Sequence, residues 1–108
     1  MKHLELAGKQ YTLDFTINSV CEAEERAGKP FSTLLNKEFS GVRWVLWCGL
    51  LERHPMTVKE VGVLMNEHIK AGGSFKALTE ECISALTSSG FFGEAAEGAD
   101  QEVLMPAT

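Results

Sequence analysis

Long apolar runs are missing from this sequence of 108 residues. The longest, residues 44–51, spans eight residues and includes a glycine, whereas a transmembrane helix needs roughly 20 apolar residues. Residues 1–10 also lack the apolar segment of a secretory signal peptide. We therefore expect no membrane partner, and we expect the chain to reside in the cytoplasm.

Cysteine is scarce, and its spacing fits no metal or redox motif. Cys21, Cys48 and Cys82 form an odd, widely separated set without a CxxC pair, which disfavours zinc and thioredoxin-like chemistry. The three histidines form no HExxH motif and no pair at helical spacing. We therefore expect no metal and no cofactor, with the cysteines acting as reduced core thiols.

Basic residues are few and scattered. Residues 1–90 carry 11 acidic and 10 basic residues, while residues 91–108 carry four acidic residues and no lysine or arginine. Nucleic-acid binding draws its affinity from clustered cations. The charge pattern therefore indicates that the chain does not bind nucleic acid.

The sequence offers no catalytic constellation. Its acidic clusters, residues 22–25 and 80–81, have the polar neighbours of solvated helix faces, whereas acid–base chemistry needs carboxylates in a desolvated cleft. No serine or cysteine has a local base and orienting group. We infer that the chain is not an enzyme. A small enzyme or ligand-binding domain, with aromatic side chains lining a deep pocket, remains an alternative.

A β-hairpin is predicted at the start of the chain. Residues 3–6 and 11–15 alternate polar and apolar side chains around a turn at residues 7–10. Leu4, Leu6, Tyr11, Leu13 and Phe15 can share one face. A lone two-stranded ribbon is marginal in water, so this face must pack on helices or the ribbon must extend another sheet.

Helical patterns follow the hairpin. The first helix is expected from residues 17–19, capped by Asn18 or Ser19, to a stop at Gly28. A short second helix is expected over residues 30–37, and a third, capped by Ser40, over residues 41–53. The third is apolar nearly all round, which is typical of an enclosed helix.

Two further helices complete the pattern. The fourth begins with a capping box at Thr57 and Glu60 and ends at residues 72–73. The fifth, residues 75–88, is capped by Ser74 and closed by Gly90. The inward faces of the two are expected to consist of Val58, Val61, Leu64, Met65, His68 and Ile69, and of Phe75, Leu78, Cys82, Ile83 and Leu86.

The predicted fold class is α+β and mostly α. Residues 1–90 form one domain, in which the β-hairpin precedes a compact bundle of four to five helices. Residues 91–108 lack a sustained apolar period and carry charge of one sign, which favours a disordered acidic tail.

What remains is binding through surfaces. A strand edge, an apolar groove in the helical body and the tail, with its apolar residues 91–92 and 103–105, are the three candidates. The same edge and apolar surface invite self-association as a homo-oligomer. The side chains expected to contact a partner are Tyr11, Phe15, Trp44, Trp47, Met65, Phe91 and Phe92.

Two segments carry a family resemblance, residues 6–35 and 39–65. Their order and spacing resemble those of tail assembly chaperones of long-tailed phages and prophages, in the group that includes the small tail protein of gene transfer agents. The matching positions are Gly8-Lys9, Tyr11, Phe15, Asn18, Glu22, Glu25, Gly28-Lys29-Pro30, Arg43, Leu46-Trp47, Gly49-Leu50 and residues 57–64.

The resemblance implies a protein that makes and breaks no bonds. Proteins of this kind bind the tape-measure protein and keep its long helices from aggregating until tube subunits polymerise around it. The implied partners are therefore the tape-measure protein and the tail tube subunits, in the cytoplasm of a bacterial host. Some relatives are described as tube components, so a structural role in the virion is the second hypothesis.

Overall fold

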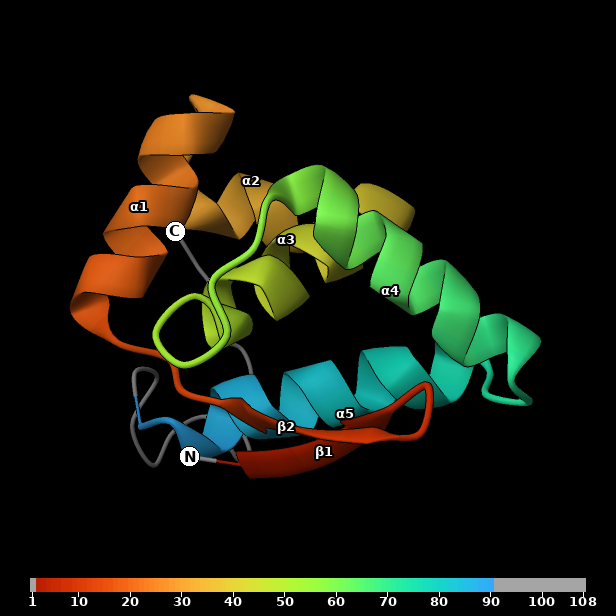
Figure 1. Ribbon diagram of the computed structural model, residues 1–108. Helices are drawn as coiled ribbons and strands as arrows, with labels where there is room; N and C mark the ends of the chain where they lie inside the picture. Colours follow the sequence, from red (N-terminus) through yellow and green to blue (C-terminus); the bar gives the residue numbers. More distant parts are fainter. Residues whose placement is uncertain (1, 91–108) are drawn as a thin grey trace.

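The computed structural model describes residues 2–90, and residues 1 and 91–108 lie outside the description. The order of elements confirms the expected fold class: an antiparallel β-hairpin comes first and helices follow. Figure 1 shows the hairpin along one margin of the described chain, with the helices on the other side. The elements are β1 (Lys2–Leu6), β2 (Lys9–Leu13), α1 (Ile17–Ala27), α2 (Phe31–Leu35), α3 (Phe39–Leu50), α4 (Val58–Lys70) and α5 (Phe75–Ser88).

The hairpin turns within two residues, so the turn is tighter than expected. Ala7 and Gly8 both have positive φ, 52° and 85°, as a type I′ turn requires. Leu6 pairs with Lys9 and Leu4 with Tyr11, so two residues of the predicted turn belong to β2. Leu4, Leu6, Leu13 and Phe15 are buried as expected, and Tyr11 is half-buried.

The core forms around α3. This helix contacts the other four helices and β2, and its residues 45–50 are buried without interruption. An interior helix has no face for water, which explains the apolar sequence all round it. The remaining helices and the hairpin therefore bury their apolar faces against one shared element.

Gly49 lets the hairpin approach α3 closely. A Cβ at this position would lie 2.9 Å from Cζ of Phe15 and 3.3 Å from Cβ of Leu13. In the absence of that carbon, the Asp14 N–H donates to the Gly49 carbonyl at 2.8 Å. The end of β2 is thus hydrogen-bonded to the central helix.

Two histidines also hold the hairpin. His54, in the α3–α4 loop, accepts the Thr12 N–H at Nε2 (3.0 Å), and His68 of α4 accepts the Ala7 N–H at Nδ1 (3.2 Å). A ring nitrogen that accepts a hydrogen bond carries no proton, so each ring is bound through its unprotonated nitrogen. Helical spacing placed His68 on the inward face of the fourth helix, and neither contact with the hairpin was predicted from the sequence.

Helix caps agree with the sequence prediction at three places. Thr57 and Glu60 form the expected capping box of α4, with bonds of 3.0 and 2.8 Å. Ser74 caps α5 by accepting the Ala77 N–H at 3.0 Å. Gly28 ends α1 in the left-handed conformation.

Two other caps differ from the prediction. The N-cap of α1 is Thr16, whose hydroxyl accepts the Ser19 N–H, while the Ser19 hydroxyl accepts the Thr16 N–H, both at 3.0 Å. Ser19 is therefore the third helical residue and not the cap. Helix α3 begins at Phe39, after Glu38, without a side-chain cap, and ends at Leu50, before the expected Arg53.

Not every predicted core position is buried. Ile69 and Ile83 are 40% and 57% exposed, and the thiol-bearing residue Cys21 is exposed, whereas Cys48 and Cys82 are buried as expected. The apolar arcs of α4 and α5 are wider than their contacts with the body. Part of each arc therefore faces outward.

Candidate functional site

An apolar groove runs between α5 and the wall formed by α2 and α3. Its cavity volume is about 690 Å³. The α5 wall results from helical spacing, because Phe75, Thr79, Cys82, Ile83 and Leu86 recur on one side of that helix. The lining residues are Leu35, Asn36, Lys37, Glu38, Gly41, Val42, Val45, Phe75, Lys76, Thr79, Glu80, Cys82, Ile83, Leu86 and Thr87.

The groove has a buried apolar floor and a partly exposed apolar rim. Val42, Val45 and Leu86 of the floor are each less than 9% exposed. On the rim, Leu35 and Ile83 are 38% and 57% exposed. Covering such large apolar side chains with a partner stabilises the complex by about 25 cal/mol for each Å² of apolar surface removed from water.

Charges of both signs border the groove. Lys37 and Glu38 stand at the α2–α3 side, and Lys76 and Glu80 at the α5 side, all four exposed. An apolar centre with a mixed polar rim is the usual composition of a protein–protein contact surface. The arrangement suits the apolar stripe of an amphipathic helix, with polar side chains on both flanks.

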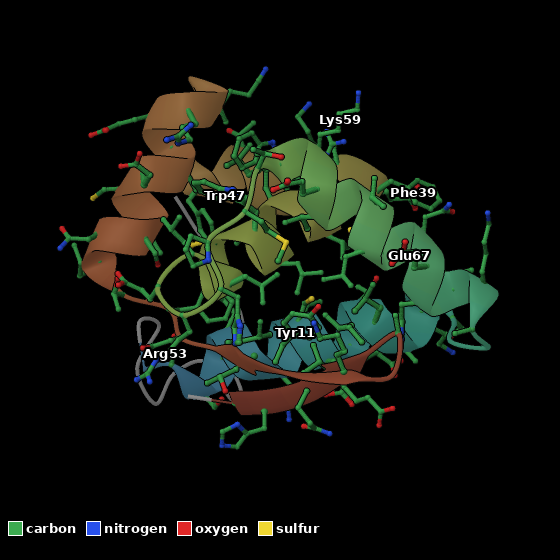
Figure 2. All side chains as sticks on the ribbon, in the orientation of Figure 1. Tyr11, Phe39, Trp47, Arg53, Lys59 and Glu67 are labelled. Atoms are coloured by element: carbon green, nitrogen blue, oxygen red, sulfur yellow. The ribbon has the colours of Figure 1, made fainter. Side chains whose placement is uncertain are left out.

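An aromatic pair lies beside the groove. The rings of Phe39, the first residue of α3, and Phe75, the first residue of α5, have centroids 4.4 Å apart. Phe39 is 66% exposed. This pair extends the apolar surface beyond the groove itself, and Figure 2 shows Phe39 well away from Tyr11 and Trp47.

Three of the predicted contact residues are part of the core. Phe15, Trp47 and Met65 are 8%, 2% and 8% exposed. The Trp47 indole N–H donates to the Met56 carbonyl at 2.7 Å. In this conformation these side chains stabilise the fold and present almost no surface to a partner.

The other predicted contact residues do not join them in one surface. Tyr11 is half-buried and meets His54 edge-on, with centroids 5.0 Å apart. Trp44 is partly buried and packs at 81° to Trp47. Phe91 and Phe92 lie outside the described residues. None of the five described residues lines the groove, so sequence reasoning missed its lining.

The signal for the groove was present in α5. Its sequence carries apolar residues at 75, 78, 82, 83 and 86, an arc wider than one neighbouring helix covers. Because Ile83 was assigned to the inward face, the uncovered part of this apolar arc was not recognised. The exposed Phe39 was hidden because the predicted helix began two residues later.

The groove floor contains a thiol that stays protonated. Burial, with a smaller contribution from the charge of Glu81, raises the pKa of Cys82 from 9.0 to about 12. Burial likewise raises the pKa of Cys48 to about 11, although its hydrogen bond to Ser19 (3.4 Å) acts in the opposite direction. Nucleophilic thiol chemistry needs the thiolate, so neither buried thiol is activated at neutral pH.

Within residues 2–90, no three His, Cys, Asp or Glu side chains are grouped closely enough to hold a metal ion. Over the same range, no helix has the length and hydropathy to cross a bilayer. No family model, no curated protein and no solved structure matches this chain.

Proposed function

We propose that this protein acts by reversible protein binding, as a tail assembly chaperone of a long-tailed phage or prophage. In this role it holds apolar helical segments of the tape-measure protein in the host cytoplasm before the tail tube forms around them. The observation that carries the proposal is the groove of about 690 Å³ between α5 and the α2–α3 wall, with its exposed apolar rim.

A helix fits the chemistry of this groove. Apolar side chains at positions i, i+3, i+4 and i+7 of a partner helix reach the floor formed by Val42, Val45 and Leu86. The rim residues Lys37 and Glu80 can then meet polar side chains of either sign. Because the contacts are mostly apolar, they tolerate many helical sequences, as a chaperone for a long repetitive partner requires.

Binding of this kind involves no bond making or breaking. It needs only that covering Leu35, Phe39 and Ile83 stabilises the complex more than it costs to order the partner. A modest net gain keeps binding reversible, so polymerising tube subunits can displace the chaperone. The proposal therefore assigns the groove to recognition and assigns the buried thiols to packing.

Co-expression with the tape-measure protein encoded by the same phage or prophage tests the proposal. We expect the two proteins to co-purify and the soluble fraction of the tape-measure protein to rise. Ile83→Glu places a charge on the groove rim and should reduce recovery of the complex about tenfold or more. Ile17→Glu is the matched control, because Ile17 is 65% exposed on α1, away from the groove, and it should leave the complex intact.

Failure of the wild-type chain to co-purify or to solubilise its partner would refute the chaperone role. If Ile83→Glu and Ile17→Glu gave equal recovery of the complex, the groove would not be the binding surface. Mass spectrometry of purified particles separates the second hypothesis, a tube-associated virion component. A chaperone is scarce or missing in finished particles, whereas a tail component is present in fixed stoichiometry.

A further inference from the structure

The two edges of the β-hairpin are not equivalent. In an antiparallel hairpin with a two-residue turn, the pair next to the turn, Leu6 and Lys9, exchanges hydrogen bonds, and pairs alternate from there. The backbone groups of Thr12 and His3 therefore point outward, on opposite edges. The Thr12 N–H points away from β1 in this pattern, and it donates to His54.

The helical body binds the far end of the outer edge of β2. The Thr12 N–H binds His54, and the Asp14 N–H beyond the strand binds the Gly49 carbonyl. Another strand cannot pair here without breaking both bonds. The β2 edge is therefore closed to strand addition.

The outer edge of β1 is open. Among the contacts made by residues 2–90, only one engages this edge: at its turn end, the Ala7 N–H binds His68. The outward backbone groups of His3 and Glu5 have no hydrogen-bond partner within residues 2–90, and both residues are exposed. Figure 1 shows β1 at the lower margin of the described chain, with β2 above it.

Two usual protections of an edge strand, proline and a bulge, are missing from β1. Natural edge strands are blocked by proline, by a bulge or by lysine side chains that project along the edge. The segment Lys2–Leu6 has no proline and pairs with β2 in continuous register. Its single lysine is directed to α5, where Lys2 Nζ lies 3.6 Å from Glu81 Oε1.

The open edge is complementary to itself. If two copies of β1 pair antiparallel with Leu4 at the centre, His3 of each copy stands opposite Glu5 of the other. These are the residues with free outward groups, so each opposed pair exchanges two backbone hydrogen bonds. Their side chains share the exposed face of the hairpin, because Leu4 and Leu6 are buried on the other. The His3 imidazole of one copy then faces the Glu5 carboxylate of the other.

We propose that the edge of β1 is a docking surface for a second copy of this chain, forming a twofold-symmetric four-stranded sheet centred on Leu4. A twofold interface needs a self-complementary surface, and both the hydrogen-bond pattern and the opposed His3 and Glu5 side chains of this edge meet that condition. The groove lined by α5 is not part of the interface. This inference is independent of the proposed chaperone role.

Charge exchange at the paired positions tests the interface in the full-length chain. By sedimentation across a concentration series, the wild type should show a monomer–dimer equilibrium. His3→Glu places two carboxylates opposite each other at both pairs and should raise the dissociation constant roughly tenfold. His3→Glu combined with Glu5→Lys removes the repulsion by placing opposite charges at both pairs, and it should return the constant to within about threefold of wild type.

A surface control and a direct contact complete the test. Asn66→Glu adds one negative charge at an exposed position of α4 and should leave the dissociation constant unchanged. In a mixed sample of labelled and unlabelled chains, Leu4 should show intermolecular NOEs to Leu4, because the central pair is the non-hydrogen-bonded kind with the shortest Cα separation.

A chain that stays monomeric at every concentration would overturn the proposal and would indicate that the edge is free or is covered by residues 91–108. A dimer that neither His3→Glu nor the exchanged pair affects would overturn it as well, because another surface must then hold the two copies. Circular dichroism melts establish that each variant is folded under the conditions of the sedimentation experiment.

Discussion

At the residue scale, His54 and His68 have the most specific structural role. Each accepts one backbone N–H of the hairpin, so the two rings replace strand partners that the sheet lacks. Backbone donors removed from water need such acceptors, and an unpaired one costs about 1–3 kcal/mol. The rings therefore help to fix a ribbon that two strands alone would stabilise poorly.

Replacing either ring nitrogen tests this role. His54→Phe and His68→Phe keep a ring of similar size but leave the Thr12 or Ala7 N–H without its acceptor. Each should lower the free energy of unfolding by about 1–3 kcal/mol, measured by urea denaturation. His3→Phe is the control: its Nδ1 contact with Thr12 Oγ1 (3.1 Å) is exposed, and it should cost less than about 0.5 kcal/mol. Equal costs for all three variants would contradict the role.

At the element scale, the ends of the helices decide how the hairpin continues into the bundle. Thr16 caps α1 and also donates its hydroxyl to Glu52 Oε2 at 2.8 Å. Nearby, Arg53 Nε lies 3.3 Å from Asp14 Oδ2. The link between β2 and α1 is thus held to the segment that follows α3.

Removal of the Thr16 hydroxyl should destabilise the protein by about 1 kcal/mol, as for other N-cap threonines. Thr16→Ala loses both the bond from Ser19 N–H and the bond to Glu52, whereas Thr16→Ser keeps the hydroxyl and should stay close to wild type. Asn18→Ala, at the cap position that the sequence suggested, should cost less than about 0.5 kcal/mol in thermal or urea unfolding. A larger loss for Asn18→Ala than for Thr16→Ala would show that the helix begins later.

Elements were predictable where a local signal had no competitor. The box formed by Thr57 and Glu60 was the only good cap before α4, whereas α1 offered Thr16, Asn18 and Ser19 within four residues, and choosing among them depends on the tertiary position of Glu52. The start of α3 was missed because Glu38 provides no side-chain cap. Local sequence therefore determined which elements exist better than where they begin.

The candidate site was less predictable than the elements, for a physical reason. Periodicity indicates which residues are apolar on one face of a helix, but it does not indicate how much of that face a neighbour will cover. Trp47 and Met65 were expected to contact a partner, although Trp47 stands in an apolar segment and Met65 on the inward face of its helix. The packing of α3 and α4 buries both. Ile83 was expected in the core, and the spacing between α5 and α2–α3 leaves it at the groove.

At the scale of the whole molecule, the groove and the open strand edge are formed by different parts of the chain. The groove belongs to α2, α3 and α5, while the edge belongs to β1, so a partner helix and a second copy can bind at the same time. A dimer would then present two grooves to one long partner. Linked binding of this kind raises overall affinity without new contacts, provided that the partner spans both sites.

The buried thiols make the whole fold less stable as the pH rises above 9. Burial raises the pKa of Cys48 to about 11 and that of Cys82 to about 12, from an ordinary value of 9.0, so both thiols keep their protons longer in the folded state. Above pH 9 the unfolded chain releases these protons and the folded chain does not, so the free energy of unfolding falls as pH rises. Below pH 9 both states bind the proton and the contribution is complete.

We expect each buried thiol to contribute a slope of about 1.4 kcal/mol per pH unit between pH 9 and its folded pKa. Lysine and tyrosine titrate in the same range, so the pH dependence of each variant is compared with that of the wild type. Urea denaturation from pH 8 to 10.5 should show a shallower decline for Cys82→Ala, even though its stability at pH 8 is lower because of the cavity. Cys21→Ser should leave the slope unchanged, because Cys21 is exposed. If the Cys82→Ala slope equals that of wild type, the Cys82 thiol ionises in the folded chain and the groove floor admits water.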